Sequence, residues 1–260
     1  MKKKLRNYGF RIDSIKESDY IFGGGMVPME ILQEDGDWTP YLPQFEAQNL
    51  NGIEPYACVS FTILNAIEIL IFKKYGIREN FSDRFLAIVS GTKEGGNSPQ
   101  VVCEFLRKLG VCNETDLPFS PDINTFDKFY SLIAPKLYEL AREIFAKYDF
   151  KHEIVPSTDE AILKALKCSP LGLSVSAWWE RGSKYYKPDG MTDNHFTTLI
   201  KAKSNDYKRV FDSYADGIGD PYLKDYEWNT KHSVIKRFWI QKKEVKKLSW
   251  FQRLWSFFML

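Results

Sequence analysis

Glu54-Pro55-Tyr56-Ala57-Cys58-Val59-Ser60-Phe61 is the stretch in which a loop turns into a long apolar run. The run continues to residue 75 with few polar interruptions, which predicts a buried central helix over 58–75. Cys58 stands at the start of this helix rather than in its middle. The N-terminus of a helix stabilises a thiolate and lowers the pKa of the thiol, so the position suits a nucleophile.

Residues that could activate this thiol lie far downstream. His195, in Asn194-His195, opens an apolar strand, and Asp212 ends the next predicted strand, 17 residues later (212 − 195). A turn at 204–206 would join the two strands as an antiparallel pair and place His195 beside Asp212. The carboxylate could then orient the imidazole and favour its protonated form, and the imidazolium would stabilise the Cys58 thiolate.

Gln48, ten residues before Cys58 (58 − 48), is the candidate for binding an oxyanion. Its side-chain NH2 could donate to the developing negative charge together with the backbone N–H of Cys58. Each candidate also has an ordinary structural reading, because free cysteines are usually core residues, a strand histidine is often structural and a loop glutamine is usually solvated. Cys103, Cys112 and Cys168 lack a comparable setting and are expected in the core.

The composition narrows the classes of function. A formal net charge of +2 gives no electrostatic case for nucleic acid as a partner. No CxxC pair, HExxH motif or His/Cys cluster points to a metal, and no nucleotide-binding glycine pattern occurs, so neither a metal nor a cofactor is expected. The four cysteines lack the spacing of a disulfide framework, which fits a reducing compartment.

The order of the elements predicts an α+β fold, with a mainly helical first half and a mainly β second half. Helices are expected over 58–75, over 99–109 with Ser98 as N-cap, and over 125–148 with a break at Pro135, and 81–90 is expected as a helix or turn cluster. Ser157 with Glu160 predicts a further capped helix reaching about 167. Strands are expected over 171–178, 194–203, 207–214 and 233–241.

On these residues the chain resembles papain-like cysteine peptidases, particularly the divergent bacterial and bacteriophage forms. The 137 residues from Cys58 to His195 (195 − 58) lie inside the range of about 130–150 given for the papain group. Segments 8–20, 42–48, 95–99 and 109–119 also look like segments of the family, so the resemblance covers nearly the whole chain. It implies a helical N-terminal half packed on an antiparallel, β-barrel-like C-terminal half, with the active-site cleft between them. It also implies that Gly95, Gly96, Trp178 and Asn194 line the substrate site.

The sequence departs from the family pattern in three places. The spacing from Gln48 to Cys58 is longer than usual, which leaves Gln44 as the alternative oxyanion residue. Asp212 stands where the family usually has asparagine, so it should still orient His195 but with a full charge. Residues 1–45 are too few for a long inhibitory pro-segment, and the chain is therefore expected to be made active or to be regulated otherwise.

Three segments are expected along the chain. Residues 1–45 form an extended N-terminal arm laid over the domain, 46–241 the papain-like peptidase domain, and 242–260 a basic and aromatic amphipathic tail. The tail could bind a membrane surface, since its aromatic residues could share one helical face, or it could dock on its own domain or on a partner subunit. The absence of a secretory signal and of a membrane span favours a cytoplasmic protein, with association with a virion as the alternative.

The favoured function is a cysteine-type peptidase acting on a peptide or protein substrate. Cys58 attacks the carbonyl, His195 acts as general acid and base, Asp212 orients His195, and Gln48 binds the oxyanion. One alternative is a papain-like structural or binding module, for example in a virion, that keeps these residues without using them. Another is an acyl-transferring enzyme of the transglutaminase type, against which the long Cys-to-His separation argues.

Overall fold

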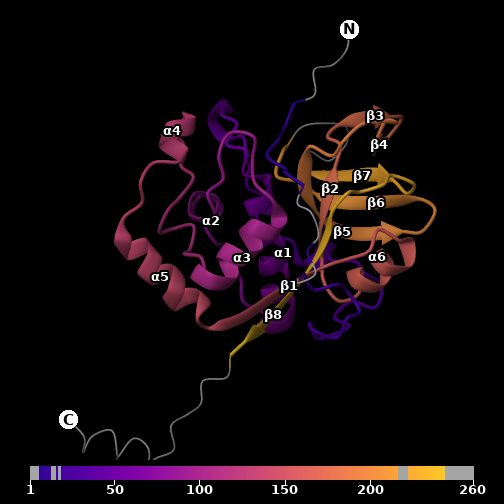
Figure 1. Ribbon diagram of the computed structural model, residues 1–260, viewed down its shortest axis with the longest axis horizontal. Coiled ribbons are helices and arrows are strands. Elements are labelled where there is room, and N and C mark those ends of the chain that lie inside the picture. The colour runs from indigo at the N-terminus through magenta and orange to yellow at the C-terminus, as the bar shows by residue number, and fades with distance from the viewer. Residues whose placement is uncertain (1–5, 13–15, 17–18, 216–221, 244–260) are drawn as a thin grey trace, which may run out of the picture.

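The computed structural model describes residues 6–12, 16, 19–215 and 222–243 of the chain. Figure 1 shows a helical half on the left and a β-sheet half on the right, with helix α1 between them. The expected α+β fold, with a helical N-terminal part and a mostly antiparallel C-terminal sheet, is therefore confirmed.

Helix α1 (Cys58–Tyr75) is the centre of the molecule and has the predicted bounds. It is apolar on nearly all sides because it is enclosed on nearly all sides: the sheet strands β2, β5 and β8 contact it, and so do helices α2 and α3. It ends at Gly76, whose left-handed backbone (φ 66°) lets its N–H return to the carbonyl of Phe72. The position of Cys58 is thus set by a rigid, buried element.

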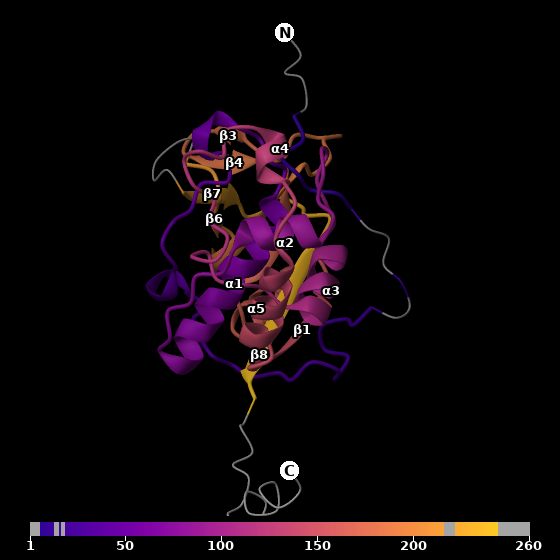
Figure 2. The same cartoon turned by 90° about the vertical axis from the view of Figure 1, so that its left-hand side faces the viewer.

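The other helices of the first half are α2 (Asp83–Val89), α3 (Pro99–Leu109), α4 (Phe126–Phe129) and α5 (Pro135–Phe145), and Figure 2 views the molecule from their side. Ser98 caps α3 as predicted, since its side chain accepts a hydrogen bond from the Val101 N–H. The expected helical stretch 125–148 is interrupted before Pro135 as predicted and divides into α4 and α5, because the residue before Pro135 is extended. The predicted end is too late, since α5 ends at Phe145 and Tyr148 already belongs to a strand.

Helix α6 (Asp159–Leu166) begins one residue later than the predicted cap implies. The side chain of Thr158, not of Ser157, accepts the hydrogen bond from the Ala161 N–H. The Ser157 hydroxyl instead donates to the backbone carbonyl of His232. A neighbouring loop therefore takes the hydroxyl that the local sequence favours as the cap.

One eight-stranded sheet forms the second half, in the order β1-β8-β2-β5-β6-β7-β4-β3. Its strands are β1 (Tyr148–Ile154), β2 (Leu171–Val175), β3 (Trp179–Arg181), β4 (Lys184–Tyr186), β5 (His195–Lys203), β6 (Tyr207–Phe211), β7 (Leu223–Glu227) and β8 (Ile235–Lys242). The predicted strands correspond to β2, β5, β6 and β8. The four strands that sequence reasoning missed are short or rich in charged residues, so they lack the apolar alternation on which strand prediction depends.

Residues 6–12, the described start of the predicted arm and here called the N-terminal segment, run between the two halves (Figure 1). Phe10 forms a parallel bridge with Asn97 and stacks on Phe196 of β5 at 5.8 Å between ring centres. Of the predicted tail, residues 244–260 lie outside the described residues. Among the residues that are described, no helix is both long and apolar enough to cross a membrane.

Candidate active site

Strands β5 and β6 form an antiparallel pair that brings His195 and Asp212 together, as predicted. Nε2 of His195 lies 2.9 Å from Oδ1 of Asp212, and both side chains are fully buried. The backbone N–H of Tyr214 also donates to Oδ1, at 3.2 Å, and Nε1 of Trp178 donates to Oδ2, at 3.0 Å. Although burial opposes the charged form, His195 and Lys224 lower the pKa of Asp212 to about 2. The imidazole is therefore held at one nitrogen by an ionised carboxylate.

Cys58 is the first residue of α1 and lies beside Phe196 of β5, the residue that follows His195. The backbone N–H groups of Phe196 and of Val59 provide hydrogen bonds to its sulfur. The second ring nitrogen of His195, Nδ1, is buried and has no hydrogen-bond partner among the described residues. The helix start thus places the thiol against the residue that follows His195 in the strand, and Nδ1 of His195 has no partner among the described residues.

The surroundings of Cys58 act mainly against ionisation of its thiol. Burial raises the pKa of Cys58 well above its ordinary value, and the negative charges of Glu54 and Asp212 raise it further. The hydrogen bonds from Phe196 and Val59 act in the opposite direction but are weaker than burial. Cys58 is fully buried in this arrangement, and this burial opposes the effect expected of a helix N-terminus.

Gln48 is fully buried and reaches this site through its side-chain amide. Its Nε2 donates to the hydroxyl of Tyr214 at 2.8 Å, to Oε1 of Glu54 at 3.0 Å and to the backbone carbonyl of Tyr8 at 3.2 Å. Gln44, the alternative, lines a separate cavity beside α1 and Arg78. The structure thus brings Gln48 to the site and not Gln44, despite the long loop to Cys58.

The N-terminal segment crosses the site at Tyr8. The Tyr8 backbone N–H donates to the carbonyl of Asn194 at 2.9 Å. Its ring centre lies 4.7 Å from that of Trp178, 5.5 Å from that of Tyr214 and 5.9 Å from that of His195. Both the backbone and the ring of Tyr8 therefore cover the histidine, and the short predicted arm is long enough to close the site.

All four residues predicted to line the substrate site contact this segment. Trp178 and Asn194 do so through Tyr8, and Asn194 also donates from Nδ2 to the carbonyl of Arg6 at 2.7 Å. The carbonyl of Gly95 accepts a hydrogen bond from the Asn7 side chain at 2.9 Å. At Gly96 a Cβ atom would lie 1.9 Å from the backbone oxygen of Gly9, so only glycine permits this close approach. All four predicted substrate residues thus lie against the N-terminal segment of the same chain.

Four residues of the site were missed by sequence reasoning: Tyr8, Glu54, Tyr214 and Lys224. Glu54 accepts from Gln48 and from the Tyr214 hydroxyl, and it pairs with Arg6 at 3.1 Å. Tyr214 directly follows Phe211-Asp212-Ser213, and its closeness to the predicted site residue Asp212 could have identified it from the sequence. The others come from an extended arm, a loop and a charged strand, where no local pattern marks them.

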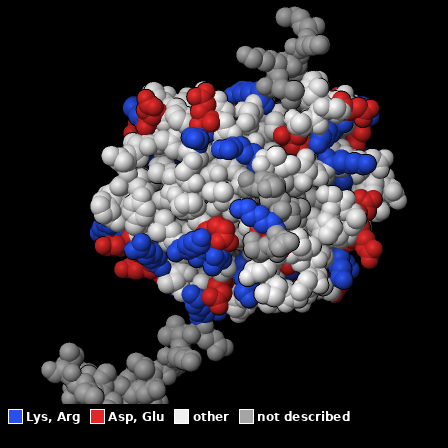
Figure 3. Space-filling view, viewed as in Figure 1, with Lys and Arg blue, Asp and Glu red and all other residues white. Residues whose placement is uncertain are grey.

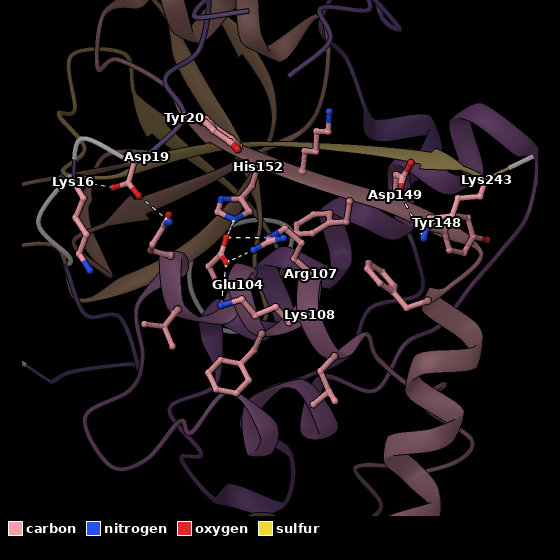
Figure 4. Close-up of a pocket in the computed structure, with 17 residues that line it drawn as sticks. Lys16, Asp19, Tyr20, Glu104, Arg107, Lys108, Tyr148, Asp149, His152 and Lys243 are labelled. Carbon is pink, nitrogen blue, oxygen red and sulfur yellow. Dashed lines mark hydrogen bonds and ion pairs between the residues drawn. The ribbon is translucent and has the colours of Figure 1, made fainter. Parts of the chain in front are cut away.

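A cavity of about 1060 Å³ lies elsewhere, between α3 and β1, with charged side chains around it (Figure 4). Glu104 meets Arg107 at 2.7 Å and Nε2 of His152 at 3.1 Å inside it. On the face in Figure 3, Lys and Arg are interspersed with Asp and Glu, so this face has no single-sign field that would favour nucleic acid.

Comparison with known proteins identifies the fold. No family model matches the chain, and no curated protein sequence matches it. Among solved structures the chain is similar to xylellain, a cysteine protease from Xylella fastidiosa, with a TM-score of 0.64 and 16% identity over 94% of this chain and 98% of that one.

Two plant proteins have the same architecture. One is the proform of the Amb a 11 cysteine protease, a major ragweed pollen allergen (TM-score 0.58, 14% identity, 85% of this chain and 69% of that one). The other is the Carica candamarcensis cysteine protease CMS1MS2 in complex with E-64 (TM-score 0.58, 17% identity, 80% of this chain and 98% of that one). The chain therefore has the fold of papain-like cysteine proteases.

Proposed function

We propose that this protein is a cysteine-type peptidase that hydrolyses peptide bonds through Cys58. His195 is the general acid and base, Asp212 orients it, and Gln48 binds the oxyanion. The observation that carries the proposal is the geometry of His195: Asp212 holds Nε2, while Nδ1 is unengaged and the Cys58 sulfur bonds to the next backbone amide of the strand. His195 and Asp212 thus supply the base and the orienting group that a nucleophile requires.

In the proposed reaction, His195 first accepts a proton from Cys58 and then donates a proton to the leaving amine. The Cys58 proton passes to Nδ1 of His195 as the sulfur attacks the peptide carbonyl, and Gln48 with the Cys58 N–H stabilises the oxyanion. The carbon–nitrogen bond then breaks, and the leaving amine takes the proton from His195. Water, deprotonated by His195, attacks the thioester, which releases the carboxylic acid and restores the thiol.

A peptide substrate is supported by how the protein holds its own N-terminal segment. Tyr8 donates its N–H to the Asn194 carbonyl and offers its own carbonyl to Gln48. Because Gly96 has no side chain, the backbone of Gly9 can approach it closely. A substrate would use the same groups, so the N-terminal segment has to leave before a substrate enters, and the described arrangement is a closed form.

One observation favours a second candidate, a papain-like binding module without hydrolysis. The thiol is fully buried, which raises its pKa, and Glu54 lies beside the oxyanion glutamine. A protein that never opens would keep this arrangement permanently. The two candidates differ in whether Cys58 reacts when the segment is released.

Reaction with an epoxide-type thiol-protease inhibitor tests the proposal, with the modified residue mapped by mass spectrometry. We expect modification at Cys58 and cleavage of an unfolded protein substrate, and loss of both in Cys58→Ala. Cys103→Ala, at a buried core cysteine, is the control and should behave as the native chain does. Equal labelling of Cys58→Ala would refute the assignment. Absence of both labelling and cleavage in Tyr8→Ala, which should release the segment, would favour the binding module.

A further inference from the structure

Asp212 is a buried carboxylate at a position where the papain-like resemblance predicts a neutral asparagine. Its Oδ1 faces Nε2 of His195 at 2.9 Å, and its Oδ2 accepts a hydrogen bond from Nε1 of Trp178 at 3.0 Å. A fully buried charge is strongly unfavourable unless it is paired and hydrogen-bonded. The substitution of a charge for an amide therefore requires a compensating charge nearby.

Lys224, on β7, supplies that charge. Strand β7 is antiparallel to β6, with Lys224 opposite Val210. Nζ of Lys224 lies 3.5 Å from Oδ2 of Asp212 and donates to the backbone carbonyl of Tyr214 at 2.5 Å, and the lysine side chain is fully buried. The ammonium also lies 5.1 Å from the centre of the Trp178 ring. Several elements of the site thus hold the ammonium against the carboxylate.

We propose that Lys224 is a positioning residue of the active site, whose ammonium neutralises Asp212 so that the pair orients His195 without a net charge. The inference rests on the proposed function, in which His195 transfers the proton. An uncompensated carboxylate would hold the proton on the imidazole, because a nearby opposite charge favours the charged form. A general acid must instead release its proton to the leaving amine. Lys224 thereby gives the aspartate the electrostatic character of the amide that it replaces.

Among the described residues, further charged and titratable groups surround His195 and Asp212. They are Cys58 of α1, Glu54 before it, Arg6 and Tyr8 of the N-terminal segment, Tyr214 after β6 and Tyr226 of β7. Burial raises the pKa of Tyr214 and of Tyr226 well above the ordinary value, so both stay neutral. Arg6 pairs with Glu54 at 3.1 Å. Asp212 is the charged group in direct contact with His195, and Lys224 acts on the imidazole through it.

An NMR titration of the His195 imidazole in the full chain tests this role, in a Cys58→Ser background so that the thiol does not titrate with it. Lys224→Met is expected to raise the His195 pKa by about one unit or more, since the carboxylate loses its counter-charge. Asp212→Asn should lower this pKa, because an ammonium then remains near the imidazole. The double variant, with an amide and no ammonium, should return to within about half a unit of the native value.

Lys208→Met is the matched control. Lys208 is an equally buried lysine on β6, but its ammonium donates to the backbone carbonyls of Trp228 at 2.6 Å and Thr230 at 2.8 Å. Its removal should lower stability and leave the His195 titration unchanged. The inference is overturned if Lys224→Met shifts the titration no more than Lys208→Met. If Lys224→Met does not fold, Asp212→Asn and the double variant decide, and equal His195 pKa values in these two would overturn it as well.

The titration needs no substrate, so it fails or succeeds separately from the proposed function. If the His195 pKa values follow the expected order but no form that contains Cys58 cleaves a substrate, the peptidase proposal is wrong and the electrostatic role of Lys224 stands. Cleavage together with an unchanged titration would keep the peptidase and remove Lys224 from its site. In the native Cys58 background, the double variant should also recover cleavage that each single variant loses.

Discussion

The side-chain amide of Gln48 donates a hydrogen bond to the backbone carbonyl of Tyr8 at 3.2 Å. The residue proposed to bind the oxyanion of a substrate is therefore occupied by a peptide carbonyl of the same chain. The proposed nucleophile is shielded in the same arrangement, since Cys58 is fully buried. Opening of the N-terminal segment should consequently control whether the thiol reacts, and three of the four predictions below depend on this.

Tyr8→Ala should speed the alkylation of Cys58 by iodoacetamide. The substitution removes ring contacts with Trp178, His195 and Tyr214, each of the kind worth about 0.5–1.5 kcal/mol. A loss of one or two kcal/mol would raise the open fraction roughly 5–30-fold. Tyr20→Ala, at an exposed tyrosine further along the chain, is the control and should alkylate at the native rate. Equal rates in the two variants would show that Tyr8 does not shield the thiol.

Gly96→Ala should release the segment, whereas Gly95→Ala should not. The two glycines share a φ of 86°, so alanine strains the backbone similarly at both positions. A Cβ at Gly96 would meet the Gly9 backbone oxygen at 1.9 Å, but a Cβ at Gly95 meets nothing within 4 Å. Limited proteolysis within residues 6–12 and the rate of Cys58 alkylation should both increase in Gly96→Ala alone. Matching increases in both variants would attribute the effect to strain and not to the contact with Gly9.

Gln48→Ala should reduce kcat about 10²–10³-fold, the usual cost of losing one oxyanion donor. The measurement belongs in the Tyr8→Ala background, because Gln48 also binds the N-terminal segment and its loss would otherwise open the site as well. Gln44→Ala in the same background is the control, since Gln44 lines a different cavity, and should keep full activity. If Gln44→Ala lost more activity than Gln48→Ala, the oxyanion assignment would be reversed.

The free energy of unfolding should fall as the pH drops from about 6.5 to 4, in part because of His152. Burial and the charge of Lys236 lower the pKa of His152 to about 4, against the opposing effect of Glu104, which lies beside His152 in Figure 4. The unfolded chain therefore binds a proton in this window that the native state does not, and stability is lost until the pH reaches the folded pKa.

His152→Gln removes this titration. The native chain should lose on the order of 3 kcal/mol more than the variant between pH 6.5 and 4, at 1.36 kcal/mol per pKa unit. Urea denaturation at several pH values in this range measures the difference. His232, whose pKa burial lowers to about 3, contributes in the same direction and is present in both chains. Parallel pH dependences for the two chains would show that His152 titrates normally in the folded protein.

The helical core and the candidate nucleophile could be predicted because their signals are local. The apolar run over 58–75 gave the exact bounds of α1, and Ser98 marked the start of α3. His195 and Asp212 could be paired because a tight turn between their strands makes the contact nearly local. Where several elements compete for one group the prediction failed, as at Ser157, whose hydroxyl binds the carbonyl of His232 instead of capping α6.

The sequence by itself determined which residue types are present for a thiol hydrolase and in which order, since periodicity, capping and turn signals act over a few residues. The tertiary structure alone decided the state of that site. The ring of Tyr8 packs against His195, and the Lys224 ammonium offsets the charge of the Asp212 carboxylate. Lys224 is buried, although the charged residues of its strand give no sign of burial in the sequence. Burial then raises the pKa of the Cys58 thiol, although its place at a helix start favours the thiolate. Desolvation and pairing depend on residues distant in the chain, and no local pattern encodes them.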